Sequence, residues 1–148
     1  VALGTAAGLA EQHMTDERTR VAAMRDHLEH GLLKSCPNAR VNGSPRSRLP
    51  NTTNVSFEYI EGESILLLMN EFNIAASSGS ACTSGSLEPS HVLRAMGLPY
   101  TALHGSIRFS LSRYNTMDEV ELILEKLPPI ITRLREISPY GRMAEGDA

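Results

Sequence analysis

The chain has 148 residues and a formal net charge of −3 at pH 7, and 41% of its residues are hydrophobic. These values predict one soluble domain with a core of its own, and they give no reason to expect a nucleic acid or an anionic membrane as a partner. The longest strongly apolar run covers only residues 65–69, which is far too short to span a membrane.

Cysteine usage favours a reducing environment. The two cysteines, Cys36 and Cys82, are too few for a disulfide framework or for a metal cluster of their own. The first ten residues lack the basic start of a secretory signal peptide. We therefore expect a cytoplasmic location.

Residues 1–35 are expected to form one long helix that acts as a connector rather than as a core element. Its first half is rich in alanine, and its second half places four apolar residues on one face at helical spacing. Cys36, Pro37 and Asn38 end the helix. The apolar residues on the common face are Val21, Met24, Leu28 and Leu32.

Short strands and helices alternate over residues 36–140, which we expect to form one small domain. Thr116 and Glu119 match a capping box that begins a final helix, and Pro128 and Pro129 are expected to kink or split this helix. The expected strands lie at about 40–42, 53–57 and 107–111, a short extended piece lies at 74–76, and the expected helices lie at 64–72, 89–96 and 117–137.

This order of elements predicts the α/β class, and more closely an α+β sandwich in which helices cover one face of a mainly antiparallel sheet. Residues 43–50 are expected to be a polar, basic loop, and residues 141–148 a frayed tail. The final helix is expected to bury one apolar stripe against the sheet. This stripe consists of Val120, Ile123, Leu127, Ile130, Ile131, Leu134 and Ile137.

The most informative segment is the run SSGSACTSGS, residues 77–86, which has Cys82 near its centre. Core cysteines usually have apolar neighbours, whereas serine and glycine favour turns and mobility. A nucleophile that must move between a pocket and a second protein needs such a segment. Composition alone leaves two interpretations open: a loop that carries a nucleophile, and a polar loop that happens to contain a cysteine.

Arg108 stands between Ile107 and Phe109 in an expected strand, so its side chain lies on the opposite face from theirs. A planar guanidinium in this position is suited to bind a carboxylate at two points. The alternative is an arginine that reaches solvent or pairs with a structural acidic residue. His104, just before this strand, is either a candidate auxiliary group for proton transfer or an ordinary loop histidine.

The chain resembles the C-terminal portion of the NifS/IscS-type cysteine desulfurases, which are class V aminotransferases. The resemblance covers residues 4–140 and is closest to the nitrogen-fixation branch, NifS. The closing LPPIITRLREISPY (127–140) is similar to the last helix of the family. The other segments that carry the resemblance are LPNTTNVSFEYIEGESILLLMNEF (49–72), IAASSGSACTSGSLEPSHVLRAMGL (74–98) and HGSIRFSLSRYNT (104–116).

The resemblance implies the small C-terminal domain of a fold-type I enzyme that uses pyridoxal 5′-phosphate (PLP) and acts as a homodimer. Such transferases convert L-cysteine to L-alanine and pass the sulfur to an iron–sulfur scaffold protein or another acceptor. By this resemblance Cys82 becomes a persulfide and Arg108 holds the substrate carboxylate. A further implication is that Cys82 transiently ligates an iron–sulfur cluster held mainly by the scaffold.

The chain departs from the family in its lysines. The two lysines, Lys34 and Lys126, do not lie in a segment that resembles the family's cofactor site, which belongs to a large domain on the N-terminal side. The resemblance therefore implies that PLP is bound mainly outside this chain and that the chain alone does not turn over cysteine. The alternative is a non-catalytic sulfur carrier or docking module that receives sulfur in trans.

Overall fold

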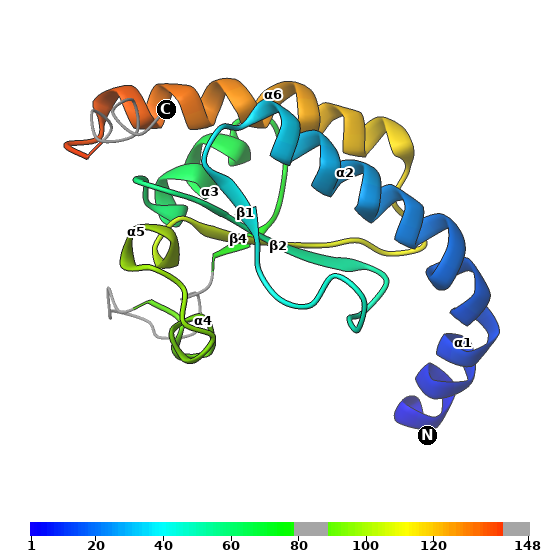
Figure 1. The fold of residues 1–148 in the computed structure, drawn as a ribbon. Coiled ribbons are helices and arrows are strands. Elements are labelled where there is room, and N and C mark those ends of the chain that lie inside the picture. Colours follow the sequence, from blue (N-terminus) through cyan, green and yellow to red (C-terminus); the bar gives the residue numbers. More distant parts are fainter. Residues whose placement is uncertain (79–88, 141–148) are drawn as a thin grey trace.

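The computed structural model describes residues 1–78 and 89–140 of the chain (Figure 1). Helices and strands alternate along these residues, and the strands form one sheet. In chain order the elements are α1 (Ala2–Asp16), the π-helical turn η1 (Glu17–Val21), α2 (Ala22–Ser35), β1 (Ala39–Val41), β2 (Thr52–Phe57), α3 (Gly62–Asn70), β3 (Ser77–Ser78), α4 (His91–Ala95), α5 (Tyr100–Leu103), β4 (Ser106–Ser110) and α6 (Met117–Ile137).

The sheet has four strands in the order β1-β2-β4-β3, and each neighbouring pair is antiparallel. The predicted fold class, a mainly antiparallel sheet combined with helices, is therefore confirmed. The sequence predicted only an extended piece at residues 74–76, and it missed β3 just beyond that piece. The two serines of β3 carry no strand pattern of their own, and they are in a strand because they pair with Ile107 and Arg108 of β4.

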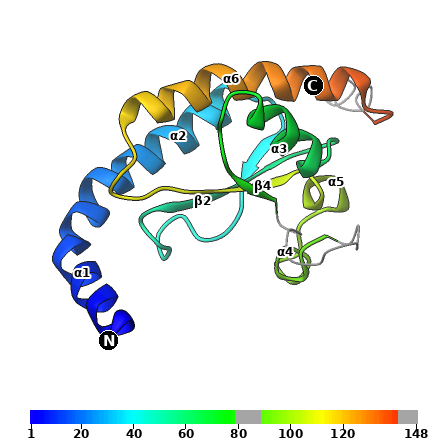
Figure 2. The same ribbon diagram turned by 180° about the vertical axis from the view of Figure 1, so that it is seen from behind.

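Helices α2, α3 and α6 cover one face of the sheet, and the core lies between them and the strands (Figures 1 and 2). α2 and α6 run side by side in both views. The sheet contributes Val55, Phe57, Ile107 and Phe109, none of which is more than 2% exposed. Because burial of one such side chain stabilises a fold by about 1.5–3 kcal/mol, this face holds the molecule together.

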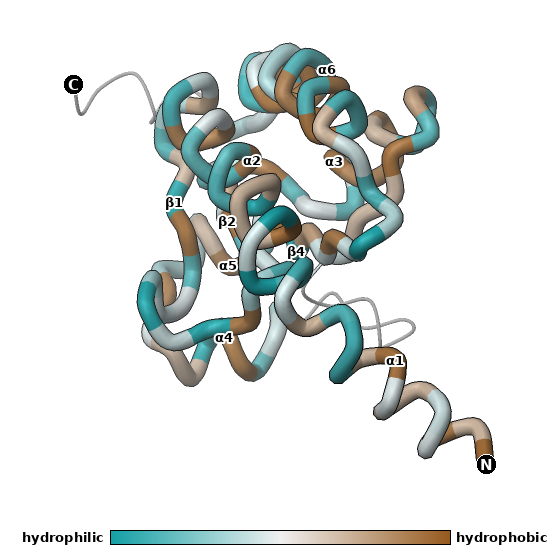
Figure 3. The backbone as a smooth tube through the Cα atoms, turned by 90° about the vertical axis from the view of Figure 1, so that its right-hand side faces the viewer, coloured by the Kyte–Doolittle hydropathy of each residue, from teal (hydrophilic) through white to brown (hydrophobic). Residues whose placement is uncertain are grey.

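The first helix is continuous from Ala2 to Ser35, and its two halves differ in burial. α1 has no buried residue and projects away from the sheet (Figure 3). The four apolar residues predicted on one face, from Val21 to Leu32, are all buried in the core. α2 is thus a core element, which differs from the interpretation of residues 1–35 as a connector. That role stays a prediction for α1.

α6 begins with the predicted capping box. The Glu119 amide donates to Thr116 Oγ1 at 3.3 Å, and the Thr116 amide donates to Glu119 Oε2 at 3.0 Å. The sequence predicted that Pro128 and Pro129 kink or split the helix; both lie inside one helix, so the split is absent. Buried residues before and after the prolines pack into the same core, and this packing outweighs the lost backbone hydrogen bonds. The predicted stripe is buried except for its last residue, Ile137, and the tail at 141–148 lies outside the described residues.

Two short helices join β3 to β4. The predicted helix at 89–96 is present as α4, with Ser90 as its N-cap, and Gly97 follows it at a φ of +76°, which glycine adopts without strain. Ser86, the predicted cap, lies outside the described residues. α5 was not predicted, because its four residues are too few for a periodic pattern.

Candidate functional site

The face of the sheet away from α2, α3 and α6 is polar, and we call it the open face. Along β2 and β4 the residues alternate, so that Val55 and Ile107 enter the core while Asn54 and Arg108 lie on the open face. Ser56 and Ser106 also lie on this face but are covered, and Ser106 Oγ donates to the carbonyl of Ala102 in α5 at 3.0 Å. The Arg108 end of the face is exposed.

Arg108 is the centre of a row of residues on the open face that crosses β2, β4 and β3 and continues to Asn42, just after β1. In the register of the sheet Asn54 lies opposite Arg108 on one side, and Ser77 lies opposite it on the other. Asn42 extends the row beyond Asn54, because its amide donates to the Asn54 carbonyl at 2.9 Å. We call Asn42, Asn54, Arg108 and Ser77 the cross-strand row.

The guanidinium of Arg108 makes no hydrogen bond or ion pair with any residue in the described ranges 1–78 and 89–140. The sequence left open that Arg108 pairs with a structural acidic residue, and no such partner is present in this part of the chain. A strand fixes the backbone beneath the side chain, and the fork of donors stands free on an exposed surface. This arrangement is suited to bind an anion with two oxygens.

A chain of hydrogen bonds fixes the open face beside Arg108. Asn42 Nδ2 donates to Asn54 Oδ1 at 2.6 Å and to Ser56 Oγ at 2.7 Å. The hydroxyls of Ser56 and Ser106 are 2.6 Å apart, and that of Ser106 bonds α5. These polar groups are largely buried, so their hydrogen bonds hold β1, β2 and β4 in a fixed register. The sequence analysis missed these hydrogen bonds, although the alternation of Asn54 with Val55 and Phe57 indicates that Asn54 faces away from the core.

Cys82, the predicted nucleophile, lies outside the described residues. The structure does place the start of its segment. Ser77 pairs with Arg108, and Ser78, the last described residue before the cysteine, pairs with Ile107. Ser78 is anchored further by its hydroxyl, which donates to Glu63 Oε1 at 2.6 Å. The chain that leads to Cys82 therefore departs from a point beside Arg108.

His104 is not brought to the cross-strand row by any described contact. Its Nδ1 lies 3.6 Å from Glu61 Oε2, and its ring meets that of Tyr100 edge-on at 4.8 Å between centroids. The same residues line a cavity of about 460 Å³ where β2 ends and β4 begins, between α5 and the end of α6, and its lining includes Leu134 but not Arg108. These contacts favour the interpretation of His104 as an ordinary histidine that packs this end of the sheet.

Cys36 has the properties of a structural cysteine. It is 1% exposed at the end of α2 and belongs to the hydrophobic core. Burial is the main cause that raises the pKa of its thiol above the ordinary value. Because the thiolate is the reactive form, this environment makes Cys36 a poor nucleophile.

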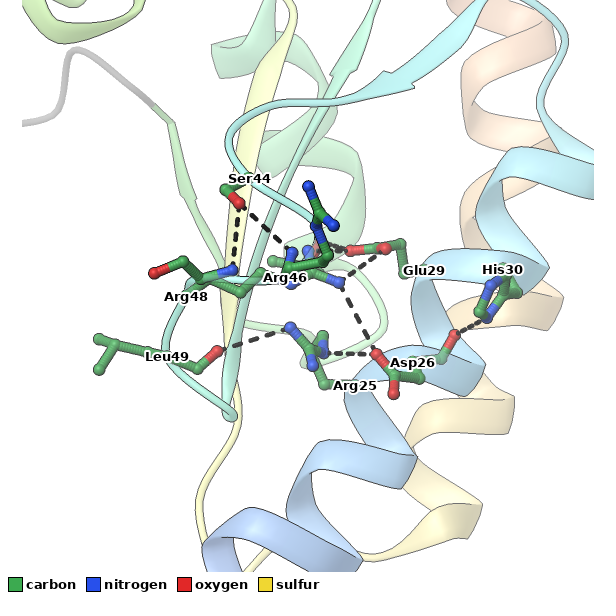
Figure 4. A network of polar contacts seen from close by, with 10 residues as sticks. Arg25, Asp26, Glu29, His30, Ser44, Arg46, Arg48 and Leu49 are labelled. Carbon is green, nitrogen blue, oxygen red and sulfur yellow. Dashed lines mark hydrogen bonds and ion pairs between the residues drawn. The ribbon is translucent and has the colours of Figure 1, made fainter.

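An ion pair that the sequence analysis did not predict fixes the basic loop 43–50 to α2 (Figure 4). Arg48 Nη1 and Nη2 donate to the two carboxylate oxygens of Glu29 at 2.6 and 2.9 Å, and Thr53 Oγ1 donates to Glu29 Oε2 at 2.5 Å. Burial acts to raise the pKa of the Glu29 carboxyl, but the hydrogen bonds from Arg48 and Thr53 outweigh it and lower the pKa below its ordinary value. Glu29 is thus held as a carboxylate that anchors the loop before β2.

Neither lysine lies near Arg108. Lys34 is exposed at the end of α2, and Lys126 in α6 pairs with Glu125 and lies 5.4 Å from the ring centre of Phe72. Both are on helices that cover the opposite face of the sheet. In the part of the chain that the structure describes, no group of three or more His, Cys, Asp or Glu residues is placed to hold a metal ion, and no helix is long and apolar enough to cross a membrane.

Comparison with known proteins places the chain in a family. A family model for class-V aminotransferases matches residues 1–123. The chain belongs to the class-V aminotransferases. It is 65% identical over 141 residues to cysteine desulfurase 2 of Trichormus variabilis and 61% identical over 140 residues to the cysteine desulfurase NifS of Azotobacter vinelandii. In each case the match covers 95% of this chain and 35% of the relative, so the chain spans about a third of these class-V relatives.

Solved structures of this family have the same fold. A NifS-like protein superposes with a TM-score of 0.73 at 30% sequence identity, over 85% of this chain and 31% of that protein. The NifS-like protein from Rickettsia africae superposes with a TM-score of 0.74 at 29% identity, over 87% of this chain and 33% of that protein. The resemblance to NifS-type desulfurases found in the sequence is confirmed at the level of the family.

Proposed function

We propose that this chain is the part of a PLP-dependent cysteine desulfurase that holds the substrate carboxylate and carries the sulfur-accepting cysteine. The observation that carries the proposal is the position of Arg108. It is an exposed guanidinium without a described partner, and it lies beside the strand from which the chain continues to Cys82. The high identity to cysteine desulfurases supports the same reaction, and the 61% identity to NifS supports a role in nitrogen fixation.

Arg108 binds the carboxylate of L-cysteine through two parallel N–H···O bonds in this proposal. The strand and the hydrogen bonds of the open face fix its backbone, so the bound substrate is held in one orientation. Such positioning lowers the entropic cost of the reaction, because the reacting atoms are already aligned. His104 is assigned no step, since it lines the cavity at the end of β2 and does not belong to the cross-strand row.

Cys82 supplies the nucleophile. Its thiolate attacks the sulfur of the bound L-cysteine, an S–S bond forms, and the C–S bond of the substrate breaks. The electron pair of that bond stays with carbon, which takes up a proton and becomes the methyl group of L-alanine. The four residues that follow Ser78, up to and including Cys82, span at most about 14 Å, so the thiol is tethered within reach of a substrate held on Arg108. The persulfide then passes its outer sulfur to an acceptor, for which we propose an iron–sulfur scaffold protein.

PLP supplies the electron sink for breaking the C–S bond. The described residues do not fit the site that anchors PLP, because neither lysine is on the face of Arg108. We therefore assign the cofactor mainly to a part of the enzyme outside this chain. We also propose that the complete enzyme is a cytoplasmic homodimer, and that Cys82 ligates an iron–sulfur cluster only transiently, while the scaffold holds it.

The same position of the lysines favours a second candidate, a sulfur carrier that receives sulfur in trans and has no cofactor of its own. Two assays distinguish these candidates. In the first, the purified chain is supplied with PLP, L-cysteine and a reductant, with or without a separate desulfurase, and persulfide on Cys82 is measured. In the second, alanine production by the full-length protein alone is measured. The carrier is supported if persulfide forms only when the separate desulfurase is added and the full-length protein makes no alanine. Alanine production by the full-length protein supports the desulfurase.

The proposed function is tested by the Cys82→Ser substitution in the complete enzyme. The substitution is nearly isosteric, and it removes the nucleophilic sulfur. We expect production of alanine and sulfide to fall to background while PLP stays bound. Cys36→Ser is the matched control and should leave both products near the wild-type level. Normal sulfide release from Cys82→Ser would refute the assignment of the nucleophile.

A further inference from the structure

We propose that Asn54 is a second donor of the carboxylate site and that its Nδ2 group binds the same carboxylate as Arg108. The inference rests on the proposed function of Arg108 and deepens it. Asn54 is half-buried on the open face, directly opposite Arg108 in the antiparallel pair of β2 and β4. The Cβ atoms of directly opposite residues are about 4.5–5.5 Å apart, so both side chains can reach one carboxylate.

The hydrogen bonds of the open face determine which end of the Asn54 amide is available. The Ser106 hydroxyl donates its proton to the Ala102 carbonyl, so its oxygen accepts from Ser56. Ser56 has then used its own proton, and it accepts from Asn42 Nδ2. The same Nδ2 group of Asn42 donates to Asn54 Oδ1 at 2.6 Å. The donor of each hydrogen bond in this series is thus fixed, and the atom of Asn54 that faces Asn42 is the oxygen, which accepts.

This direction leaves the nitrogen of Asn54 free on the side of Arg108. β2 lies between β1 and β4, and the bond from Asn42 draws Asn54 Oδ1 toward β1. Nδ2 is the other end of a planar amide, and it is therefore on the β4 side. Within residues 1–78 and 89–140, Asn54 Nδ2 has no hydrogen-bond acceptor.

The pair therefore offers only donors: the guanidinium of Arg108 and the amide nitrogen of Asn54. No described carboxylate pairs with Arg108, so an incoming ligand must supply the acceptor atoms. The two oxygens of a carboxylate have lone pairs enough for the guanidinium and for one amide N–H. Arg108 supplies the charge, and Asn54 adds a neutral donor from a second strand, which fixes the plane in which the carboxylate lies.

Removal of the Asn54 side chain separates this role from a purely structural one. Asn54→Ala removes both the oxygen that accepts from Asn42 and the free donor. If Asn54 only joined β1 to β2, the alanine variant would lose stability and keep a normal KM for L-cysteine. If Asn54 binds the carboxylate, the alanine variant also weakens substrate binding. Asn54→Asp weakens it at least as strongly, because an aspartate opposite Arg108 pairs with the guanidinium and repels the substrate.

The experiment measures KM and kcat for L-cysteine in the complete enzyme, together with the temperature of thermal unfolding. We expect Asn54→Ala to raise KM about tenfold, as for the loss of one hydrogen bond to a charged group, with kcat within about twofold of wild type. Asn54→Asp should raise KM at least as much, because its carboxylate occupies Arg108. Ser110→Ala, an exposed position on the same face of β4, is the matched control and should leave KM unchanged.

Competitive inhibition measures binding directly. L-alanine carries a carboxylate, whereas ethylamine lacks one, so a comparison of the two inhibitors isolates the contribution of the carboxylate. Both Asn54 variants should weaken inhibition by L-alanine and leave that by ethylamine unchanged. A normal KM in Asn54→Ala, with a raised KM in Arg108→Ala, would overturn the role of Asn54 and leave the proposed function intact. A normal KM in Arg108→Ala as well would overturn the carboxylate site as a whole.

Discussion

Ser77 lies directly opposite Arg108 in the antiparallel pair of β3 and β4. This pairing joins the two parts of the proposed chemistry, because the strand that ends at Ser78 is also the point from which the chain continues to Cys82. The sheet therefore holds the start of the cysteine segment beside Arg108. The proposed function thus takes its carboxylate-binding side chain and the start of the segment with its nucleophile from neighbouring strands.

The role of Arg108 predicts the effect of its removal. Arg108→Ala in the complete enzyme should raise KM for L-cysteine on the order of 100-fold, because two charge-assisted hydrogen bonds are lost. Steady-state kinetics over a wide range of cysteine concentrations measures this. Arg40→Ala is the control: Arg40 is also exposed and pairs with Ser56 on the same face, but it is outside the cross-strand row. An equal rise in KM for both variants would mean that KM depends on the overall positive charge of the open face and not on Arg108 in particular.

The difference between the two cysteines predicts their reactivity toward thiol reagents. Cys36 is buried and its thiol pKa is raised, so we expect no modification of it in the folded protein. A chromogenic disulfide reagent should modify Cys82 in the native state and both cysteines after unfolding in guanidinium chloride. Cys36→Ser should leave the native signal unchanged. Rapid labelling of Cys36 in the folded protein would contradict its burial in the core.

The ion pair between Glu29 and Arg48 predicts a loss of stability when one partner is removed. Glu29→Gln leaves a guanidinium with a side chain only 16% exposed without its carboxylate, and this should lower the free energy of unfolding by about 3 kcal/mol. Urea denaturation measures the change. Asp26→Asn is the matched control, because this carboxylate is 48% exposed and 3.7 Å from Arg48, and it should cost less than about 1 kcal/mol. Equal losses of unfolding free energy in the two variants would show that the Glu29–Arg48 pair stabilises the fold no more than the exposed Asp26 contact does.

The same carboxyl group predicts how stability depends on pH. The pKa of Glu29 is lowered from its ordinary value of 4.5, since the hydrogen bonds from Arg48 and Thr53 outweigh the effect of burial. A carboxyl with a lowered folded-state pKa stabilises the fold fully above its unfolded pKa, and this contribution is lost as the pH falls through the folded value. The difference in unfolding free energy between wild type and Glu29→Gln should therefore be constant near neutral pH and shrink below about pH 4.5. A difference that grew on acidification would contradict this sign.

Local signals in the sequence predicted much of the fold. The capping box at Thr116 and the alternation around Arg108 depend on neighbouring residues, and both are present as expected. The features that sequence reasoning missed depend on partners far along the chain. β3 is a strand because it pairs with β4, and Glu29 meets Arg48 across 19 positions. No periodic pattern within one segment contains such a pairing.

In the candidate site, too, the sequence predicted what depends on neighbouring residues and missed what depends on distant partners. Arg108 was singled out from its place between Ile107 and Phe109, and the structure adds that it has no described acidic partner. Asn54 could not be singled out from its own neighbours, because its role depends on the register that places it opposite Arg108 and on the direction of the bond from Asn42. His104 is close to Arg108 in sequence, but it lines the cavity at the end of β2, because α5 ends there.

The most direct test of the proposed function is the mass of the peptide that contains Cys82 after the complete enzyme has reacted with L-cysteine in the absence of a reductant. We expect this peptide to gain one sulfur atom, with isotope-labelled cysteine as its source, while the peptide that contains Cys36 stays unmodified. The extra sulfur should be absent in Arg108→Ala at cysteine concentrations below its raised KM. Alanine production with no sulfur on Cys82, or with the sulfur on Cys36, would contradict the account.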